Sequence, residues 1–223
     1  MAARRGAFIL LEGLDRSGKS TQCARLAATL KAAGTETAAF VFPDRTTGIG
    51  QMISAYLKQD AELDDRAVHL LFAANRWEKA AEIRQLLAAG TTIVCDRYSF
   101  SGIAYTSAKQ SGPSFEWCLA PEVGLPAPDA VLFLTLSLEE QEARGDYGEE
   151  RYEKREMQQA VREKFMQMQG LGAPWKTVDA GRTMDEVAAD ILSPAREVVE
   201  DVATGGEGGA SKPLLDFKSG LIA

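Results

Sequence analysis

Short apolar runs alternate along this chain with longer segments in which apolar residues recur every three or four positions. β-Strands are predicted at five such runs, residues 7–11, 38–42, 91–95, 130–136 and 175–178. Helices are predicted at the periodic segments between and after them, residues 20–33, 48–57, 64–89, 100–109, 138–144, 154–169 and 184–202. Strands that are apolar throughout and alternate with helices are typical of a parallel sheet covered on both faces. The sequence therefore predicts a three-layer α/β fold with a five-stranded parallel sheet.

Two segments interrupt this alternation. Residues 145–152 are charged, contain glycine and join two predicted helices, which suits either a plain surface loop or a mobile lid. Residues 204–223 begin with a glycine-rich stretch followed by Pro213, and we expect most of them to be disordered. One domain is therefore predicted over residues 1–203, followed by a tail whose apolar residues have no evident partner.

Composition narrows the class of protein. The 223 residues are 45% hydrophobic and 26% charged, as in an ordinary soluble globular protein. No apolar run approaches the roughly 20 residues that cross a membrane, so we expect no membrane-spanning segment. The net charge of −7 argues against a broad nucleic-acid surface. Cys23, Cys95 and Cys118 are scattered, which predicts reduced thiols and a reducing, cytoplasmic compartment. The single histidine, His69, leaves no Cys/His cluster for zinc.

Residues 13–20 carry the clearest chemical signal. They read Gly-Leu-Asp-Arg-Ser-Gly-Lys-Ser and have the spacing G-x-x-x-x-G-K-[ST] between a predicted strand and a predicted helix. In that context, backbone N–H groups of the loop and of the helix N-terminus converge on phosphate oxygens. Lys19 supplies a positive charge for the outer phosphates, and the Ser20 hydroxyl is suited to ligate Mg²⁺. The segment therefore predicts a nucleotide-phosphate site.

Charged residues also follow two other predicted strands. Asp96 and Arg97 come directly after the run 91–95, and Arg45 comes shortly after the run 38–42. Ligands of open α/β sheets collect at the carboxyl ends of the strands, so we expect these residues to converge on the phosphate loop. Asp96 there is suited either to hold Mg²⁺ or simply to cap the next helix. Taken alone, Arg45 is equally well explained as a contact to a second phosphate group or as a solvated arginine on the surface.

Together these segments resemble the thymidylate kinase family, in its eukaryotic form. The resemblance runs from residue 4 to residue 202. It rests on four stretches in the family's order: residues 15–21 (Asp-Arg-Ser-Gly-Lys-Ser-Thr), 42–45 (Phe-Pro-Asp-Arg), 69–77 (His-Leu-Leu-Phe-Ala-Ala-Asn-Arg-Trp) and 96–98 (Asp-Arg-Tyr). It implies a P-loop nucleotide kinase fold with a lid, a homodimer, and Mg²⁺-dependent transfer of the ATP γ-phosphoryl group to dTMP for dTTP synthesis.

The resemblance also implies the residues of the donor side. Arg16, Lys19, Asp96 and Arg97 would be catalytic, and Ser20 and Asp96 would hold Mg²⁺, Asp96 directly or through water. Arg16 places the chain in the subtype whose extra catalytic arginine lies in the phosphate loop. ATP contacts are implied for Arg16, Ser17, Gly18, Lys19, Ser20, Thr21, Arg144 and Arg182.

On the acceptor side, the resemblance implies that Phe72 stacks on thymine and that Arg76 donates to its O4 atom. The two residues are four apart, so they share one face of a helix. Tyr105 would crowd a ribose 2′-hydroxyl, which implies a preference for deoxynucleotides. The implied dTMP contacts are Asp15, Phe42, Arg45, Phe72, Arg76, Arg97, Tyr105 and Gln158.

Several alternatives stay open at this stage. A kinase for another nucleoside monophosphate would share the phosphate loop. A guanine-dependent switch is disfavoured, because the only asparagine, Asn75, precedes Arg76 and gives no Asn-Lys-x-Asp segment. The apolar helices around residues 68–72 and 100–105 would either pair two copies of the chain or belong to the core of one.

Overall fold

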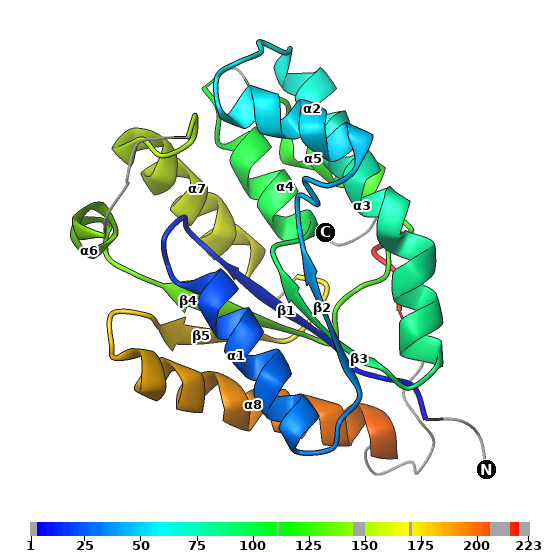
Figure 1. Ribbon diagram of the computed structural model, residues 1–223. Helices are drawn as coiled ribbons and strands as arrows, with labels where there is room; N and C mark the ends of the chain where they lie inside the picture. Colours follow the sequence, from blue (N-terminus) through cyan, green and yellow to red (C-terminus); the bar gives the residue numbers. More distant parts are fainter. Residues whose placement is uncertain (1–3, 111, 145–149, 170, 206–214, 219–223) are drawn as a thin grey trace.

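A five-stranded parallel sheet forms the centre of the protein, in the order β2-β3-β1-β4-β5 (Figure 1). The computed structural model describes residues 4–110, 112–144, 150–169, 171–205 and 215–218. The strands are β1 (Phe8–Gly13), β2 (Thr37–Val41), β3 (Thr92–Asp96), β4 (Ala130–Thr135) and β5 (Trp175–Asp179). The sequence placed all five within one or two residues of these bounds, and the predicted α/β class is confirmed.

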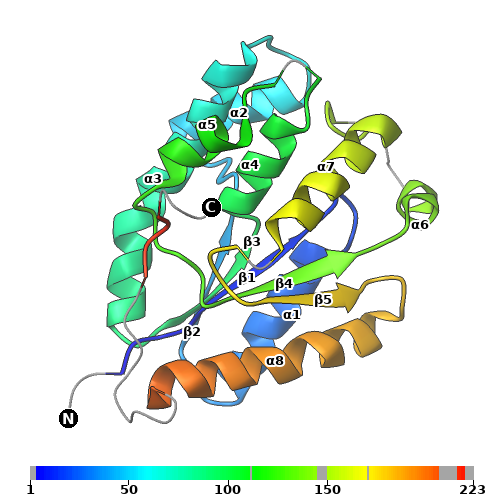
Figure 2. The same cartoon turned by 180° about the vertical axis from the view of Figure 1, so that it is seen from behind.

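Helices cover both faces of the sheet, as Figures 1 and 2 show from opposite sides. Helices α1 (Lys19–Ala32) and α8 (Met184–Thr204) lie on one face. The other face is covered by α2 (Gly48–Leu57), α3 (Asp65–Ala88), α4 (Ser99–Ser107), α5 (Phe115–Leu119) and α7 (Arg155–Met168). The short α6 (Leu138–Ala143) follows β4.

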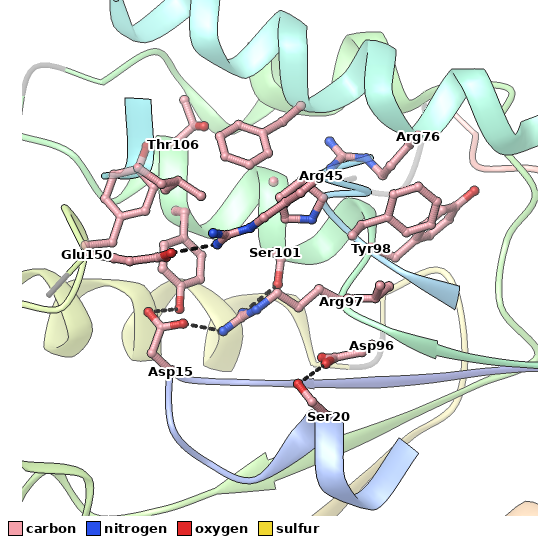
Figure 3. Close-up of a pocket in the computed structure, with 18 residues that line it drawn as sticks. Asp15, Ser20, Arg45, Arg76, Asp96, Arg97, Tyr98, Ser101, Thr106 and Glu150 are labelled. Carbon is pink, nitrogen blue, oxygen red and sulfur yellow. Dashed lines mark hydrogen bonds and ion pairs between the residues drawn. The ribbon is translucent and has the colours of Figure 1, made fainter. Parts of the chain in front are cut away.

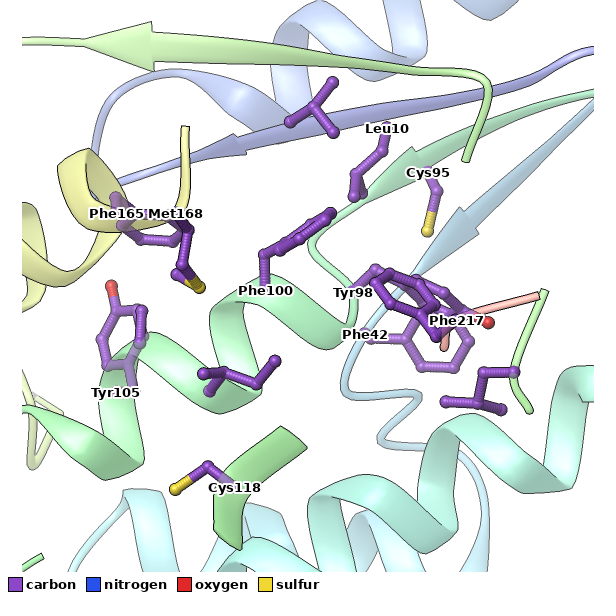
Figure 4. Packing of buried hydrophobic residues seen from close by; sticks show 14 of the residues in the cluster. Leu10, Phe42, Cys95, Tyr98, Phe100, Tyr105, Cys118, Phe165, Met168 and Phe217 are labelled. Carbon is purple, nitrogen blue, oxygen red and sulfur yellow. The ribbon is translucent and has the colours of Figure 1, made fainter. Parts of the chain in front are cut away.

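The residues of β1 explain this layering. Phe8 and Leu10 face the core shared with α3, α4 and α7, whereas Ile9 and Leu11 face the core shared with α1 and α8. Successive strand residues point to opposite faces, so an unbroken apolar strand must be covered twice. Figure 4 shows the larger core, in which Tyr98, Phe100 and Phe165 pack beneath the sheet.

Two short elements were not predicted. They are α5 and the 3-10 turn η1 (Ala120–Glu122), which lie between α4 and β4. The segment contains Pro113 and Pro121, so it carries no long helical period. Ser114 nevertheless caps α5 by accepting a hydrogen bond from the Trp117 amide.

The two irregular segments of the sequence analysis lie partly outside the described residues. Residues 145–149 of the expected lid and residues 206–214 and 219–223 of the tail are not described. For residues 215–218 the structure differs from the disorder we expected. Phe217 is buried in the larger core, because its ring meets those of Tyr98 and Phe100. None of the helices in the described part of the chain combines the length and apolar character needed to span a bilayer.

Candidate active site

The phosphate loop joins β1 to α1 at the carboxyl end of the sheet. Gly13 has a φ of 149°, and a Cβ there would lie 2.4 Å from the Leu134 carbonyl oxygen. Gly18 begins α1 in the left-handed region, with a φ of 88°. Arg16 also has a positive φ, 61°, without being glycine. Strained residues persist where the surrounding structure fixes them, and such residues cluster at functional sites.

Lys19 is folded back into this loop. Its Nζ atom donates to the Leu14 carbonyl at 2.5 Å and to Ser17 Oγ at 3.3 Å. Burial lowers the pKa of Lys19 to about 8, and the positive charge of Arg97 acts in the same direction. The carboxylates of Asp96 and Asp15 oppose this shift. The positive charge of Lys19, which would attract anions to this site, is therefore lost at a lower pH than that of an ordinary lysine.

Asp96 and Ser20 meet where β3 passes beside the phosphate loop. The parallel register pairs Leu11 of β1 with Asp96, which sets this carboxylate against the start of α1. Ser20 Oγ donates to Asp96 Oδ2 at 2.5 Å (Figure 3). Asp96 Oδ1 is buried without a hydrogen-bond partner among the described residues. A buried oxygen of this kind beside a hydroxyl is a suitable contact for a hydrated hard cation.

Arg97 and Asp15 form the centre of the site. Arg97 Nη2 lies 2.5 Å from Asp15 Oδ1, and Arg97 Nη1 donates to the Gly13 carbonyl and to Ser101 Oγ. Tyr105 donates from its hydroxyl to Asp15 Oδ2 at 2.9 Å. Burial opposes ionisation of Asp15, but the charges of Arg97 and Lys19, together with the hydrogen bonds from Tyr105 and Gln158, hold the pKa of Asp15 below its ordinary value.

A second cavity adjoins the phosphate-loop cavity, and Arg97 lines both. Phe72 and Arg76, one turn apart on α3, both line it, as do Phe42, Arg45 and Tyr105. Figure 3 shows Arg76, Arg45 and Arg97 entering this space from three different elements. The phosphate-loop cavity contacts it, because four residues line both: Asp15, Ser20, Asp96 and Arg97.

Arg76 is fixed at the end of this second cavity by Glu122. Arg76 Nε donates to Glu122 Oε2 at 2.8 Å, and Nη2 donates to Oε1. Both side chains are almost wholly shielded from water, at 2% and 0% exposure. A Cβ on Gly102 would lie 2.5 Å from Arg76 Nη2, so this glycine leaves the space that the guanidinium fills. The remaining guanidinium nitrogen of Arg76, Nη1, takes no part in this ion pair.

Arg45 projects from the loop after β2, which begins with a cis peptide bond between Phe42 and Pro43. Asn75 of α3 fixes the loop, because its side chain accepts from the Asp44 amide at 2.7 Å and donates to the Asp44 carbonyl. Arg45 itself donates to Glu150 at 2.7 Å, and both side chains are partly exposed. Arg45 also lines the second cavity.

Three expected site residues line neither cavity. Arg182 pairs with Glu186 and Asp190 of α8 and lines neither cavity, because these carboxylates hold it on the helix surface. Gln158 is buried and contacts two cavity-lining residues, because it donates to Asp15 Oδ2 at 2.7 Å and to the Tyr152 carbonyl at 2.9 Å. Ser17 turns its hydroxyl inward to Lys19. Arg144 lines the phosphate-loop cavity and donates to the Arg16 and Ala180 carbonyls.

Sequence reasoning missed several acidic residues of the site. Glu12 lies in β1, where burial raises its pKa, and it accepts from the Tyr98 amide and from Ser101. Glu153 accepts from Arg16 Nε at 3.1 Å. Glu12 could have been found as a lone acid inside an apolar strand. Nothing local marks Glu122, Glu150 or Glu153, because their partners lie far away in the sequence.

The fold and the two adjoining cavities place the protein among the P-loop nucleotide kinases. The family model for thymidylate kinase matches residues 11–191. Thymidylate kinases of Danio rerio and Homo sapiens are each 48% identical to the chain, over 200 and 192 residues. The alignments cover 89% and 86% of this chain and 94% and 90% of those proteins.

A solved structure agrees with the sequence relatives. The structure of the thymidylate kinase from Candida albicans matches with a TM-score of 0.81 and 37% identity. The match covers 96% of this chain and 99% of that one. The chain therefore belongs to the thymidylate kinase family.

Proposed function

We propose that the protein is a dTMP kinase, which transfers the γ-phosphoryl group of ATP to dTMP and forms dTDP and ADP. Its membership in the thymidylate kinase family supports this reaction. The observation that carries the proposal is the shared wall of the two cavities, formed by Asp15, Ser20, Asp96 and Arg97. Phosphoryl transfer depends mainly on positioning and charge neutralisation, and this wall is where the donor and acceptor phosphates would meet.

The donor nucleotide binds in the phosphate-loop cavity. Backbone amides of the loop and the N-terminus of α1 hold the phosphates, and Thr21 completes the helix end. Lys19 exchanges its contacts with Leu14 and Ser17 for the outer phosphates. Arg16 exchanges its contact with Glu153 for the transferring group, where its charge stabilises the transition state. Arg144 flanks the nucleotide from the rim.

Ser20 and Asp96 are the residues that would hold Mg²⁺. The unpartnered Oδ1 atom of Asp96 and the adjacent Ser20 hydroxyl fit a cation that keeps most of its waters. The described residues contain no cluster of three or more His, Cys, Asp and Glu side chains suited to a metal, which agrees with a cation held largely by nucleotide phosphates. When bound, Mg²⁺ neutralises charge that develops on the phosphate oxygens.

The acceptor binds in the second cavity. Phe72 stacks on the thymine ring, and Arg76 donates from its remaining nitrogen to O4. Arg97 and Arg45 take the acceptor phosphate, and Phe42 closes the wall beside it. Tyr105 packs against the sugar, and Asp15 accepts from the 3′-hydroxyl. Gln158 orients Asp15 rather than touching the nucleotide.

We also propose a homodimer and a reducing, cytoplasmic compartment. Of the helix positions considered for dimer formation, Val68, Phe100 and Ile103 belong to the core of one chain. Leu70 and Trp77, seven residues apart on α3, are instead exposed at 48% and 43% and offer an apolar face for a second copy. Sedimentation of Leu70→Asp beside the unaltered protein tests this face.

The three cysteines are buried and unpaired, which suits a reducing compartment.

A coupled assay of ADP release tests the reaction. The protein is supplied with ATP, Mg²⁺ and each nucleoside monophosphate in turn. Turnover with dTMP far above that with AMP, GMP and CMP supports the proposal. Turnover with another monophosphate alone would make the protein a kinase of a different specificity. ATP binding without ADP formation from any acceptor would favour a nucleotide-dependent switch.

A further inference from the structure

The tail residue Phe217 fills a position in the core directly behind the acceptor cavity. It is 2% exposed, and its ring centroid lies 6.2 Å from that of Tyr98 and 5.3 Å from that of Phe100. Tyr98 in turn lies 5.4 Å from Phe42, again between ring centroids. Figure 4 shows Phe217, Tyr98 and Phe42 gathered in one group, with their rings tilted to one another. Phe217 does not line the acceptor cavity, but it packs directly on Tyr98, which does, and reaches the cavity-lining Phe42 through Tyr98.

The backbone around Phe217 is hydrogen-bonded to the segment that follows η1. Phe217 donates to the Leu125 carbonyl at 2.9 Å and accepts from the Gly124 amide at 3.0 Å. The Ala127 amide donates to the Leu215 carbonyl at 2.8 Å. Asp216 pairs with Arg84 at 2.6 Å, and Arg84 also donates to the Gly124 carbonyl. Residues 215–218, which we call the C-terminal clasp, are thus joined to α3 and to the loop before β4.

This loop continues directly from Glu122, the partner of Arg76. The Leu125 amide donates to the Glu122 carbonyl at 3.1 Å, and Trp77 donates to the Pro121 carbonyl at 2.8 Å. The clasp therefore reaches the acceptor cavity by two routes. One passes through the ring of Tyr98 to Phe42, and the other passes through the backbone to Glu122 and Arg76.

Both routes end at residues of the acceptor side. Tyr98, Phe42 and Arg76 line the acceptor cavity, and none of them lines the phosphate-loop cavity. Loss of the Phe217 ring would leave a void against Tyr98, and cores respond to such voids by shifting their neighbours. We propose that the C-terminal clasp is a positioning element for the acceptor nucleotide, with Phe217 as its anchor. This inference rests on the proposed dTMP kinase activity.

Steady-state kinetics of the full-length Phe217→Ala variant tests the inference. Couplings through packed side chains that touch no ligand are worth roughly 0.5–2 kcal/mol, or about 2- to 30-fold. We therefore expect the KM for dTMP to rise within about that range, while the KM for ATP stays within about twofold of the original. Phe217→Leu keeps much of the apolar volume, so its KM for dTMP should lie between those of the unaltered protein and Phe217→Ala.

Two matched variants separate positioning from loss of stability. Ile191→Ala removes an equally buried side chain of α8 on the opposite face of the sheet, so it should lower the melting temperature without changing the KM for dTMP. Lys218→Ala alters an exposed clasp residue and should change neither quantity. The inference is overturned if Phe217→Ala leaves the KM for dTMP unchanged, or if Ile191→Ala raises it equally. Failure of the unaltered protein to phosphorylate dTMP would instead overturn the proposed function.

Discussion

Glu122 fixes the guanidinium of Arg76 through two of its nitrogens, and the pair is almost completely buried. An arginine held in this way cannot turn to meet different bases, so its remaining nitrogen always presents donors. Thymine offers a carbonyl oxygen to such a donor, whereas cytosine offers an amino group. Under the proposed function, Arg76 would read the base, and Glu122, which lines neither cavity, would set the orientation of Arg76.

Glu122→Gln should weaken both folding and acceptor binding. Removal of one partner of a buried ion pair leaves an uncompensated charge and costs roughly 3–5 kcal/mol of unfolding free energy. We expect urea denaturation to show a loss near this size, together with a raised KM for dTMP. Asp185→Asn is the control, because Asp185 pairs with Arg25 at the surface, and such pairs contribute roughly 0–1 kcal/mol. Equal stability losses in the two variants would contradict the role given to Glu122.

The acceptor site should reject dCMP strongly and dUMP weakly. A mispaired polar group in a buried site gives discrimination of about 10⁴-fold, which is the expected ratio of kcat/KM for dTMP over dCMP. Uracil lacks only the methyl group of thymine, worth about 0.8 kcal/mol or roughly fourfold. Competition between the three nucleotides in one assay measures both ratios. Comparable use of dCMP and dUMP would show that Arg76 does not read the base.

Arg16→Ala should lose turnover with little loss of binding. Removal of a group that stabilises charge in the transition state costs at least about 10²-fold in kcat. Arg182→Ala is the matched control, because Arg182 is bound to Glu186 and Asp190 on α8 and should leave kcat unchanged. Rapid-quench measurement of the chemical step distinguishes this effect from slow product release. An Arg16→Ala protein with unimpaired turnover would refute the assignment.

Lys19 should impose an alkaline limit on the use of ATP. Its pKa is lowered to about 8, chiefly by burial, so the protein without nucleotide loses this positive charge as the pH rises through that value. Phosphate binding favours the protonated form, so kcat/KM for ATP, which reports the free protein, should fall above a pH of about 8. The profile of kcat should fall only at higher pH, because bound phosphates raise the pKa of Lys19. A flat kcat/KM profile between pH 7 and about 9.5 would contradict this.

Local patterns predicted most of the fold but only part of the site. Every strand was found, because an apolar run bounded by helical periods is a local property of the chain, and helix 48–57 was placed to the residue. The phosphate loop and the one-turn spacing of Phe72 and Arg76 were equally local. The partners of these residues were not. Glu122, Glu150 and Glu153 meet Arg76, Arg45 and Arg16 only after folding.

Sequence patterns also failed to predict that part of the tail is buried. Its glycine-rich composition predicted disorder for residues 204–223, whereas Phe217 is buried between Tyr98 and Phe100. The apolar residues of the tail form no sustained strand or helix period, so no local pattern marked Phe217 for burial. The ATP contact expected for Arg182 stays a prediction, and in this structure Glu186 and Asp190 of α8 hold its side chain.

The central claim is that Arg97 stands between two phosphate groups, one in each cavity. A crystal structure with ADP, Mg²⁺ and dTMP bound tests it most directly. The account predicts that the Arg97 guanidinium lies within hydrogen-bond distance of the dTMP phosphate and faces the β-phosphate above Lys19, with Arg45 turned from Glu150 toward the dTMP phosphate. A complex in which Arg97 and Arg45 point away from both phosphates would contradict it.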